Sequence, residues 1–325
     1  MLSPTPILVS LLLLIDYLPL PPPPAKPSRG KPRTYTDRLM LKALVVMIIR
    51  RLYSPFAFLA FLAQPEMAHL RPLVSENGKF PTRRTWERRM KVLPTVLPAM
   101  IGCLGRHLVV ILQAWHTHGR AAAIDSTALR TGGGIWHKKH REAGEVPHST
   151  IDTEAGWSKS GWHGWWYGWK LHLAVAVSWV WIPLAAEVTV ANTADNLVAP
   201  LLLRELPLEV RYLLGDTHYN TPALRLEAWQ QGREIIATRP GPYPHRDGGA
   251  EVRSIFHKLR SLAIEPFNGL FKNIFEWGGY LPVKGLKRTQ LIVLGAIFIY
   301  QLVLLYQHEK GVAVGQGIKA LLRAA

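Results

Sequence analysis

The spacing of apolar and polar positions changes near residue 120. Before it, apolar residues recur at helical spacing, first over 37–49 and again over 53–62. After it, short apolar runs and one alternating stretch predict strands separated by helices. The predicted strands cover 121–124, 169–177, 182–190, 210–214 and 233–238, and the predicted helices cover 193–206, 222–231 and 254–275. This order predicts a mixed α/β sheet that is preceded by a mainly helical domain.

Two apolar runs could be taken for membrane segments. The run 7–15 has no basic region before it, and Asp16 and a proline-rich stretch follow it, so we expect a short helix that docks on the protein. Export or a membrane anchor is the alternative. The run 291–306 is shorter than the roughly 20 residues that span a bilayer. It predicts a buried helix, or one that packs against another subunit, and no membrane partner.

Charge narrows the choice of partner. The chain has 39 basic and 22 acidic residues, for a net charge of +17. This excess favours DNA as the partner over an anionic membrane surface, and a basic protein without a special ligand is the alternative. We therefore expect a cytoplasmic, nucleoid-associated protein. The single cysteine, Cys103, excludes a disulfide scaffold and cysteine-based zinc fingers.

Two segments combine basic residues with features of nucleic-acid binding. A predicted helix that starts at Thr82 carries Arg83, Arg84 and Arg88, and it resembles the DNA-reading helix of a helix-turn-helix pair. A solvated basic face explains the same pattern equally well. Residues 131–168 form a long glycine-rich connection with basic and aromatic groups, which suits stacking on unpaired bases. Tryptophans that pack the tip of a hairpin are the alternative.

Three carboxylates are the candidate chemistry. Asp125 follows the predicted strand 121–124, Asp216 follows 210–214, and Glu265 lies in the helical segment 254–275. We expect the three acids to converge and to bind divalent metal, because carboxylate oxygens are the ligands that Mg²⁺ prefers. Two Mg²⁺ ions would neutralise the acids and support in-line attack at phosphorus.

Other residues near these acids are candidates for contacting the substrate. Lys272 lies seven residues beyond Glu265, so both project from one helix face, and the long side chain of Arg260 can reach a phosphate. Pro266 disfavours helical backbone at the preceding residue, so a kinked or split helix is an open alternative. His218, two residues past Asp216, can support the metal site or orient the substrate.

At these residues the chain resembles a DDE transposase of the bacterial insertion-sequence type. The motifs that carry the resemblance are Ala-Ile-Asp125-Ser-Thr, Gly-Trp-Lys170-Leu-His172-Leu, Leu-Leu-Gly-Asp216-Thr-His-Tyr-Asn and Ile-Glu265-Pro-Phe-Asn-Gly-Leu-Phe-Lys272. The resemblance implies an RNase H-like catalytic core, dependence on Mg²⁺ or Mn²⁺, and Asp125, Asp216 and Glu265 as the catalytic and metal-binding triad. It adds Lys170 to the substrate-contacting candidates. The motif departs from the family around Glu265, because Ser261 and Lys258 stand where Arg and Tyr are usual.

The resemblance also sets the expected organisation and function. We expect an apolar segment and basic linker over 1–34, a helical DNA-binding domain over 35–118, the RNase H-like catalytic domain over 119–280, and an apolar helix and tail over 281–325. The expected function is metal-dependent cleavage and strand transfer at insertion-sequence ends, by at least a dimer. A nuclease without strand transfer and a non-catalytic DNA-binding protein, such as a decayed transposase, are the alternatives.

Overall fold

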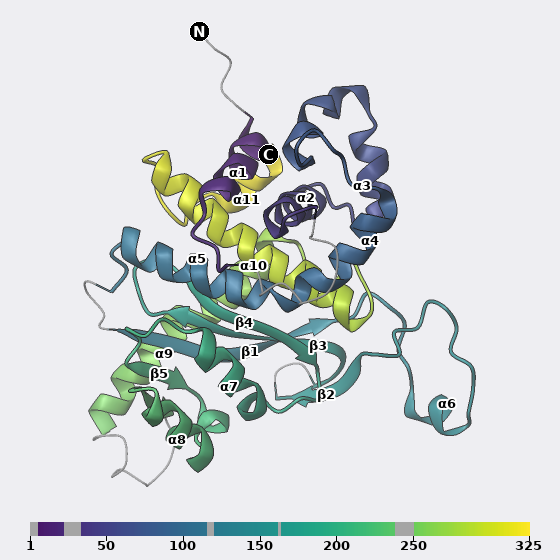
Figure 1. The fold of residues 1–325 in the computed structure, drawn as a ribbon. Coiled ribbons are helices and arrows are strands. Elements are labelled where there is room, and N and C mark those ends of the chain that lie inside the picture. The colour runs from purple at the N-terminus through teal and green to yellow at the C-terminus, as the bar shows by residue number, and fades with distance from the viewer. Residues whose placement is uncertain (1–5, 23–33, 116–119, 162–163, 238–249) are drawn as a thin grey trace, which may run out of the picture.

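The computed structural model describes residues 6–22, 34–115, 120–161, 164–237 and 250–325, and its core is one mixed sheet (Figure 1). In these residues the strand order is β2-β3-β1-β5-β6, with β4 also on β3. The strands are β1 (Ala121–Arg130), β2 (Gly156–Ser160), β3 (Gly164–Ala176), β4 (Pro183–Val190), β5 (Tyr212–Gly215) and β6 (Glu234–Ala237). Strands β1, β3 and β4 are antiparallel neighbours, whereas β5 and β6 run parallel to β1. This topology confirms the predicted RNase H-like sheet.

Strand β1 is longer than its apolar run predicted. The sequence indicated a strand over 121–124 that ends before Asp125, but β1 continues to Arg130. The reason is its neighbour β3, which pairs with β1 from Ala122 through Arg130 and satisfies the backbone of the polar half. Asp125 therefore lies inside the strand, and the expectation that it stands at a strand end was wrong.

Helices cover both faces of the sheet. Helices α5 (Leu97–Ile111) and α10 (Leu286–Glu309) lie on one side, and α7 (Asp195–Glu205) and α8 (Pro222–Gln230) lie on the other (Figure 1). Because both faces are covered, nearly all of β3 beyond Trp165 is buried. Helix α9 (Ala250–Ile274) packs against β1 and β5 and brings Glu265 to the sheet.

The remaining helices form the helical N-terminal region and several short segments. Residues 6–22 contain the predicted docking helix, α1 (Ile7–Tyr17), which buries Leu8, Leu11, Leu12 and Ile15 and packs against α2 and α10. The others are α2 (Asp37–Ile49), α3 (Pro55–Leu62), η1 (Pro65–Leu70), η2 (Pro72–Val74), α4 (Arg83–Val92), η3 (Leu93–Thr95), α6 (Lys138–Glu142), η4 (Thr217–Tyr219) and α11 (Ile318–Ala324). Most of the basic linker predicted before Thr34 lies outside the described residues.

Helix α10 is long and apolar enough to cross a membrane, yet it is part of the core. In its most apolar stretch, 89% of the residues are buried inside the protein. It packs against α2, α5 and β4, and its buried Gln301 donates hydrogen bonds to the carbonyl oxygens of Ile101 (2.9 Å) and Pro183 (2.8 Å). This matches the buried helix predicted for 291–306. A second candidate consists of α4 with η3 followed by α5, which are bent by 61°.

Helix α9 is not split by its internal proline. It runs without interruption from Ala250 to Ile274, with Pro266 inside it. Proline lacks an N–H, so the carbonyl of Leu262, four residues earlier, loses its usual helical partner. The indole N–H of Trp181 donates to that carbonyl at 3.1 Å. The hydrogen bond that the helix loses at Pro266 is thus replaced from outside, and the open alternative of a split helix is excluded.

Candidate active site

Asp125 and Asp216 come together through the register of two parallel strands. Ala121 of β1 pairs with Tyr212 of β5, and Ala123 pairs with Leu214. The same offset of 91 residues separates Asp125 from Asp216, so continuing the register two residues places the two acids side by side on one face. Asp216 lies just beyond the end of β5, as predicted.

Glu265 joins the first acid through Arg260. Nη1 of Arg260 lies 3.2 Å from Oδ2 of Asp125, and its Nη2 lies 3.3 Å from Oε1 of Glu265. The hydroxyl of Ser261 also donates to Oε1 of Glu265, at 3.1 Å. Arg260, a candidate for contacting phosphate, therefore bridges two of the three acids. Ser261, which stands where an arginine is usual, holds the third acid in place.

The carboxyl of Asp125 has an unusual affinity for protons. Burial raises its pKa to about 6, while a hydrogen bond from the backbone of Ser126 and the charge of Arg260 act in the opposite direction. The negative charges of Asp216 and Asp195 raise it further. Arg260 is one cation beside this buried carboxyl. A second cation would favour its ionised form and so allow it to ionise at a lower pH.

His218 is bound to the second acid. Its Nδ1 lies 3.0 Å from Oδ2 of Asp216, and its backbone N–H donates to Oδ1 of the same side chain at 2.8 Å. The hydrogen bond to Asp216 is the main cause that raises the pKa of His218. The histidine therefore orients the Asp216 carboxylate within the turn η4.

Lys170 lies apart from the three acids. It belongs to β3 opposite Ala128 of β1, so strand alternation places it on the other face from Asp125. Its Nζ lies 2.9 Å from Oδ1 of Asp195 and donates to the carbonyl oxygen of Thr193 at 3.1 Å. Lys170 thus fixes the start of α7.

Two residues near Lys170, Asp195 and His172, were not among the site residues predicted from the sequence. Asp195 lies in the first turn of α7, directly after the N-cap Ala194, and its carboxylate pairs with Lys170. His172 is fully buried between Asp195 and Thr189, and burial lowers its pKa to about 4. The alternation of polar Lys170 and His172 in an otherwise apolar strand was the available signal.

The remaining basic candidates lie at other places. Lys272 is in the last turn of α9, about 10 Å along the helix axis from Glu265. Burial lowers its pKa. Helix α4 begins after its predicted N-cap Thr82, and Arg83, Arg84 and Arg88 are exposed on it.

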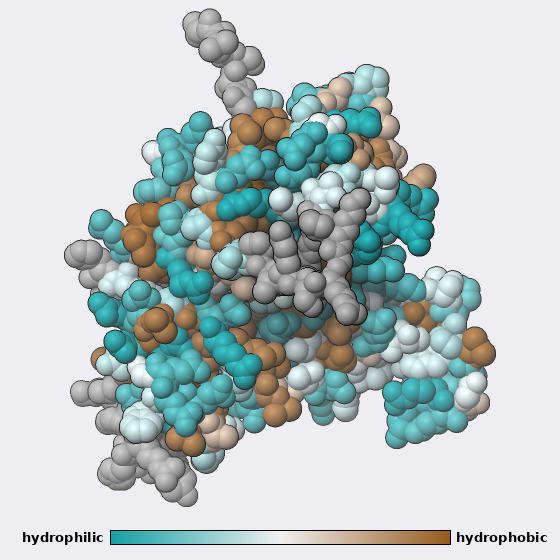
Figure 2. Space-filling model, in the orientation of Figure 1, coloured by the Kyte–Doolittle hydropathy of each residue, from teal (hydrophilic) through white to brown (hydrophobic). Residues whose placement is uncertain are grey.

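The glycine-rich connection forms an arm and a hairpin. The arm with α6 projects from the sheet (Figure 1), and its tip is covered mainly by hydrophilic residues (Figure 2). In the hairpin β2–β3, Trp166 is buried, which supports tryptophan packing. Trp165 is 65% exposed, with the Lys159 ammonium 5.7 Å from its ring, so an aromatic group also remains available. Residues 162 and 163 of the hairpin lie outside the described residues.

The donor set of the three acids fits a divalent metal chemically. Carboxylate oxygens suit Mg²⁺ and Mn²⁺. The buried hydroxyl of Tyr219 has no hydrogen-bond partner in the described chain. Burial raises its pKa well above the usual range, and the charges of Asp195, Asp125 and Asp216 raise it further. Such a hydroxyl fits a site that also holds water. No three His, Cys, Asp or Glu side chains of the described residues are already gathered as metal ligands, since Arg260 stands between Asp125 and Glu265.

The strand order and the paired acids define the class as an RNase H-like fold with a carboxylate site. Residues 116–239 match the family model for the transposase DDE domain. The match contains Asp125 and Asp216 and confirms the predicted resemblance to DDE transposases.

Two solved structures are similar to the chain. They are a Mos1 transposase paired-end complex with the left transposon end (14% identity, TM-score 0.22) and a pre-cleavage Mos1 transpososome (13% identity, TM-score 0.21). Each alignment covers 89% of this chain and 81% of the matched chain in the Mos1 structure. A comparison with curated proteins found no match.

Proposed function

We propose that this protein is a transposase that cleaves DNA at insertion-sequence ends and joins the cleaved ends to target DNA. The observation that carries the proposal is the Arg260 bridge, which brings Glu265 of α9 to Asp125 of β1. The strand register adds Asp216 to the same face. These contacts support a shared site for three acids from distant segments, and the match of residues 116–239 to the model of the transposase DDE domain supports a transposase.

The three acids would hold one or two Mg²⁺ or Mn²⁺ ions. When bound, the metal would activate a water or a 3′-hydroxyl and stabilise the leaving oxygen. The protein's own residues prepare the site. His218 orients the Asp216 carboxylate, Ser261 holds Glu265, and Arg260 balances the charge of the acids until it turns to a DNA phosphate.

Several further roles belong to the same proposal. Arg83, Arg84 and Arg88 of α4 would contact DNA phosphates, since all three are exposed and near the start of a helix. Lys272 would approach DNA from the end of α9. A net charge of +17 supports work on DNA in the nucleoid of the cytoplasm. Joining two ends of one element requires two active sites, which supports at least a dimer.

The test measures cleavage and joining of DNA that carries the ends flanking this reading frame. With Mg²⁺ or Mn²⁺, Asp125→Asn, Asp216→Asn and Glu265→Gln should each reduce cleavage about a thousandfold or more, because several kcal/mol of transition-state stabilisation depend on the metal. Binding of the same DNA should persist. Glu309→Gln, at an exposed acid of α10, is the matched control.

The fate of the cleaved 3′-end distinguishes the two enzymatic alternatives. A joined product supports a transposase, whereas free ends alone identify a nuclease. Full cleavage by any of the three acid variants would remove that acid from the site, and DNA binding without cleavage by the wild-type protein would contradict an enzyme.

A further inference from the structure

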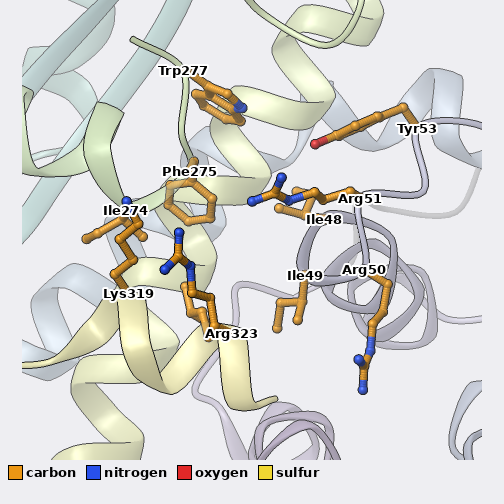
Figure 3. Close-up of a pocket in the computed structure, with 11 residues that line it drawn as sticks. Ile48, Ile49, Arg50, Arg51, Tyr53, Ile274, Phe275, Trp277, Lys319 and Arg323 are labelled. Atoms are coloured by element: carbon orange, nitrogen blue, oxygen red, sulfur yellow. The ribbon is translucent and has the colours of Figure 1, made fainter.

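A cavity lies at the C-terminal end of α9. It has a volume of about 190 Å³ and is lined by the ends of α2, α9 and α11 (Figure 3). This is many times the roughly 10–15 Å³ that one water needs. The lining begins nine residues beyond Glu265, at Ile274, or about 14 Å further along the helix. The cavity is thus separate from the three acids.

Two walls of this cavity have different chemistry. Arg51, Lys319 and Arg323 supply positive charge, whereas Phe275 and Trp277 supply aromatic surface. In Figure 3 the guanidinium groups of Arg51 and Arg323 both point toward Phe275. The three cations share the carboxylate of Glu276, and Lys319 lies 3.7 Å from it. One carboxylate among three cations leaves a surplus of positive charge.

The backbone around the cavity is held in a disfavoured conformation at two matching places. Helices α2 and α9 each end in the same motif, in which the residue after the C-cap has a left-handed backbone. These residues are Arg51 (φ 57°) and Glu276 (φ 59°), at positions where glycine is usual. The backbone N–H of Leu52 donates to the carbonyl oxygen of Met47 at 2.7 Å. The backbone N–H of Trp277 donates to the carbonyl oxygen of Lys272 at 2.8 Å.

The two left-handed residues form an ion pair with each other, and Arg51 of this pair lines the cavity. Hydrogen bonds from Arg323 and Arg51 lower the pKa of Glu276 to about 2, so the carboxylate is charged at any ordinary pH. Glycine at either position would relieve the backbone but remove a charge from the ion-pair cluster that Glu276 forms with Arg51, Lys319 and Arg323. Strained backbone that presents charged side chains into a cavity is a feature of ligand sites.

We propose that this cavity binds a nucleotide unit, with its phosphate on Arg51, Lys319 and Arg323 and its base against Phe275, the more exposed of the two aromatic residues. Arginine forks match the geometry of phosphate oxygens, and aromatic faces stack on bases of any sequence. The nucleotide is either a free mononucleotide or one unit of a DNA strand. Because Glu276 already occupies the cations, the phosphate competes with an internal carboxylate.

Calorimetry on the full chain tests the proposal, in metal-free buffer and with Asp125→Asn to prevent cleavage. The probes are deoxyadenosine 5′-monophosphate, inorganic phosphate and a short single-stranded oligonucleotide. We expect Arg323→Ala and Lys319→Ala to weaken nucleotide binding at least tenfold. Arg288→Ala, which removes an exposed charge of α10 outside the cavity, should leave it unchanged. Glu276→Gln should strengthen binding, because it removes the competing carboxylate.

The pattern across the probes identifies the source of the ligand. Binding of the mononucleotide supports a free ligand, and binding of the oligonucleotide alone, weakened by Arg323→Ala, supports a unit of a DNA strand. Inorganic phosphate that binds as tightly as the nucleotide would mean an adventitious ion only and would overturn the proposal. Equal affinities of wild type and a folded Arg323→Ala protein, verified by thermal unfolding, would overturn it as well.

Discussion

Asp125 of β1 and Asp216, just beyond the end of β5, occupy matching positions in the register of these two parallel strands. The register of β1 and β5 carries the same 91-residue offset as the two acids. Asp125 is the more buried acid, and Arg260 lies 3.2 Å from it. The charge balance of the site without metal therefore depends on Arg260, on protons, or on both.

Arg260→Ala tests whether the guanidinium of Arg260 balances the negative charge of Asp125 and Glu265. Without metal, the variant leaves Asp125 and Glu265 without their shared cation, so we expect the free energy of unfolding to fall by about 1–3 kcal/mol. Mg²⁺ should restore more stability to the variant than it adds to wild type, because the ion no longer competes with the guanidinium. Thermal unfolding with EDTA and across a Mg²⁺ series measures both. The same gain from Mg²⁺ in both proteins would contradict competition, and Arg84→Ala, at an exposed arginine, is the control.

Asp125→Asn tests whether a proton bound to the Asp125 carboxyl reduces the negative charge of the site. Burial raises the pKa of Asp125 from 3.8 to about 6, so the folded protein holds a proton there that the unfolded chain has lost. Wild-type stability should therefore fall relative to the variant as the pH rises from about 4 to 6, and then stay constant. The full shift corresponds to roughly 3 kcal/mol, and we expect less because 22% of the side chain is exposed to screening solvent. Denaturant unfolding in metal-free buffer measures the difference, and a constant difference across this range would contradict the raised pKa.

The pair Lys170 and Asp195 can be tested by a double-mutant cycle on stability. Their side chains are only 18% and 14% exposed, so we expect Lys170→Met and Asp195→Asn to show a coupling energy of about 1–3 kcal/mol. DNA affinity measured on the same variants tests the substrate contact that the sequence predicted for Lys170. If Lys170 contacts DNA, Asp195→Asn should bind DNA more tightly and Lys170→Met more weakly. A coupling energy near zero would contradict the ion pair.

The arginines of helix α4 are expected to have two different roles, DNA contact for the exposed ones and structural support for the buried one. Arg84 and Arg88 are exposed, and each change to Ala should weaken DNA binding and lower the slope of log affinity against log salt by about one. Arg89 is buried and forms an ion pair with Asp37. Arg89→Ala should instead reduce the free energy of unfolding by roughly 2–4 kcal/mol. Salt-independent DNA affinity of the wild-type protein would contradict the phosphate contacts.

Trp181 and Pro266 should be coupled through the carbonyl of Leu262. Trp181→Phe removes the indole donor and should cost about 1 kcal/mol of stability while Pro266 is present. In the Pro266→Ala background the new backbone N–H supplies a donor to that carbonyl, so the same change should cost much less. Chemical denaturation of the four proteins measures the difference. Equal costs in both backgrounds would show that the indole does not replace the missing N–H.

Local pattern identified most of the elements. Periodicity located α2, α8 and α9, and alternation located β3, because helix and strand spacing follow from backbone geometry alone. The apolar run before Asp125 marked the start of β1 but not its end. The polar half of that strand is extended because β3 lies beside it, and a neighbour of this kind leaves no trace in the local pattern.

The sequence by itself determined the three acids, the basic excess and most of the order of strands and helices, since these depend on residue type and spacing, but α6 and β2 lie where it indicated a long connection. Only the tertiary structure decided that Arg260 joins Asp125 to Glu265, that Lys170 faces Asp195, and that Trp181 makes Pro266 tolerable inside α9. Each of these is a contact between segments distant in sequence. Which residues meet in such a contact depends on how the helices pack on the sheet, and no local pattern encodes that packing.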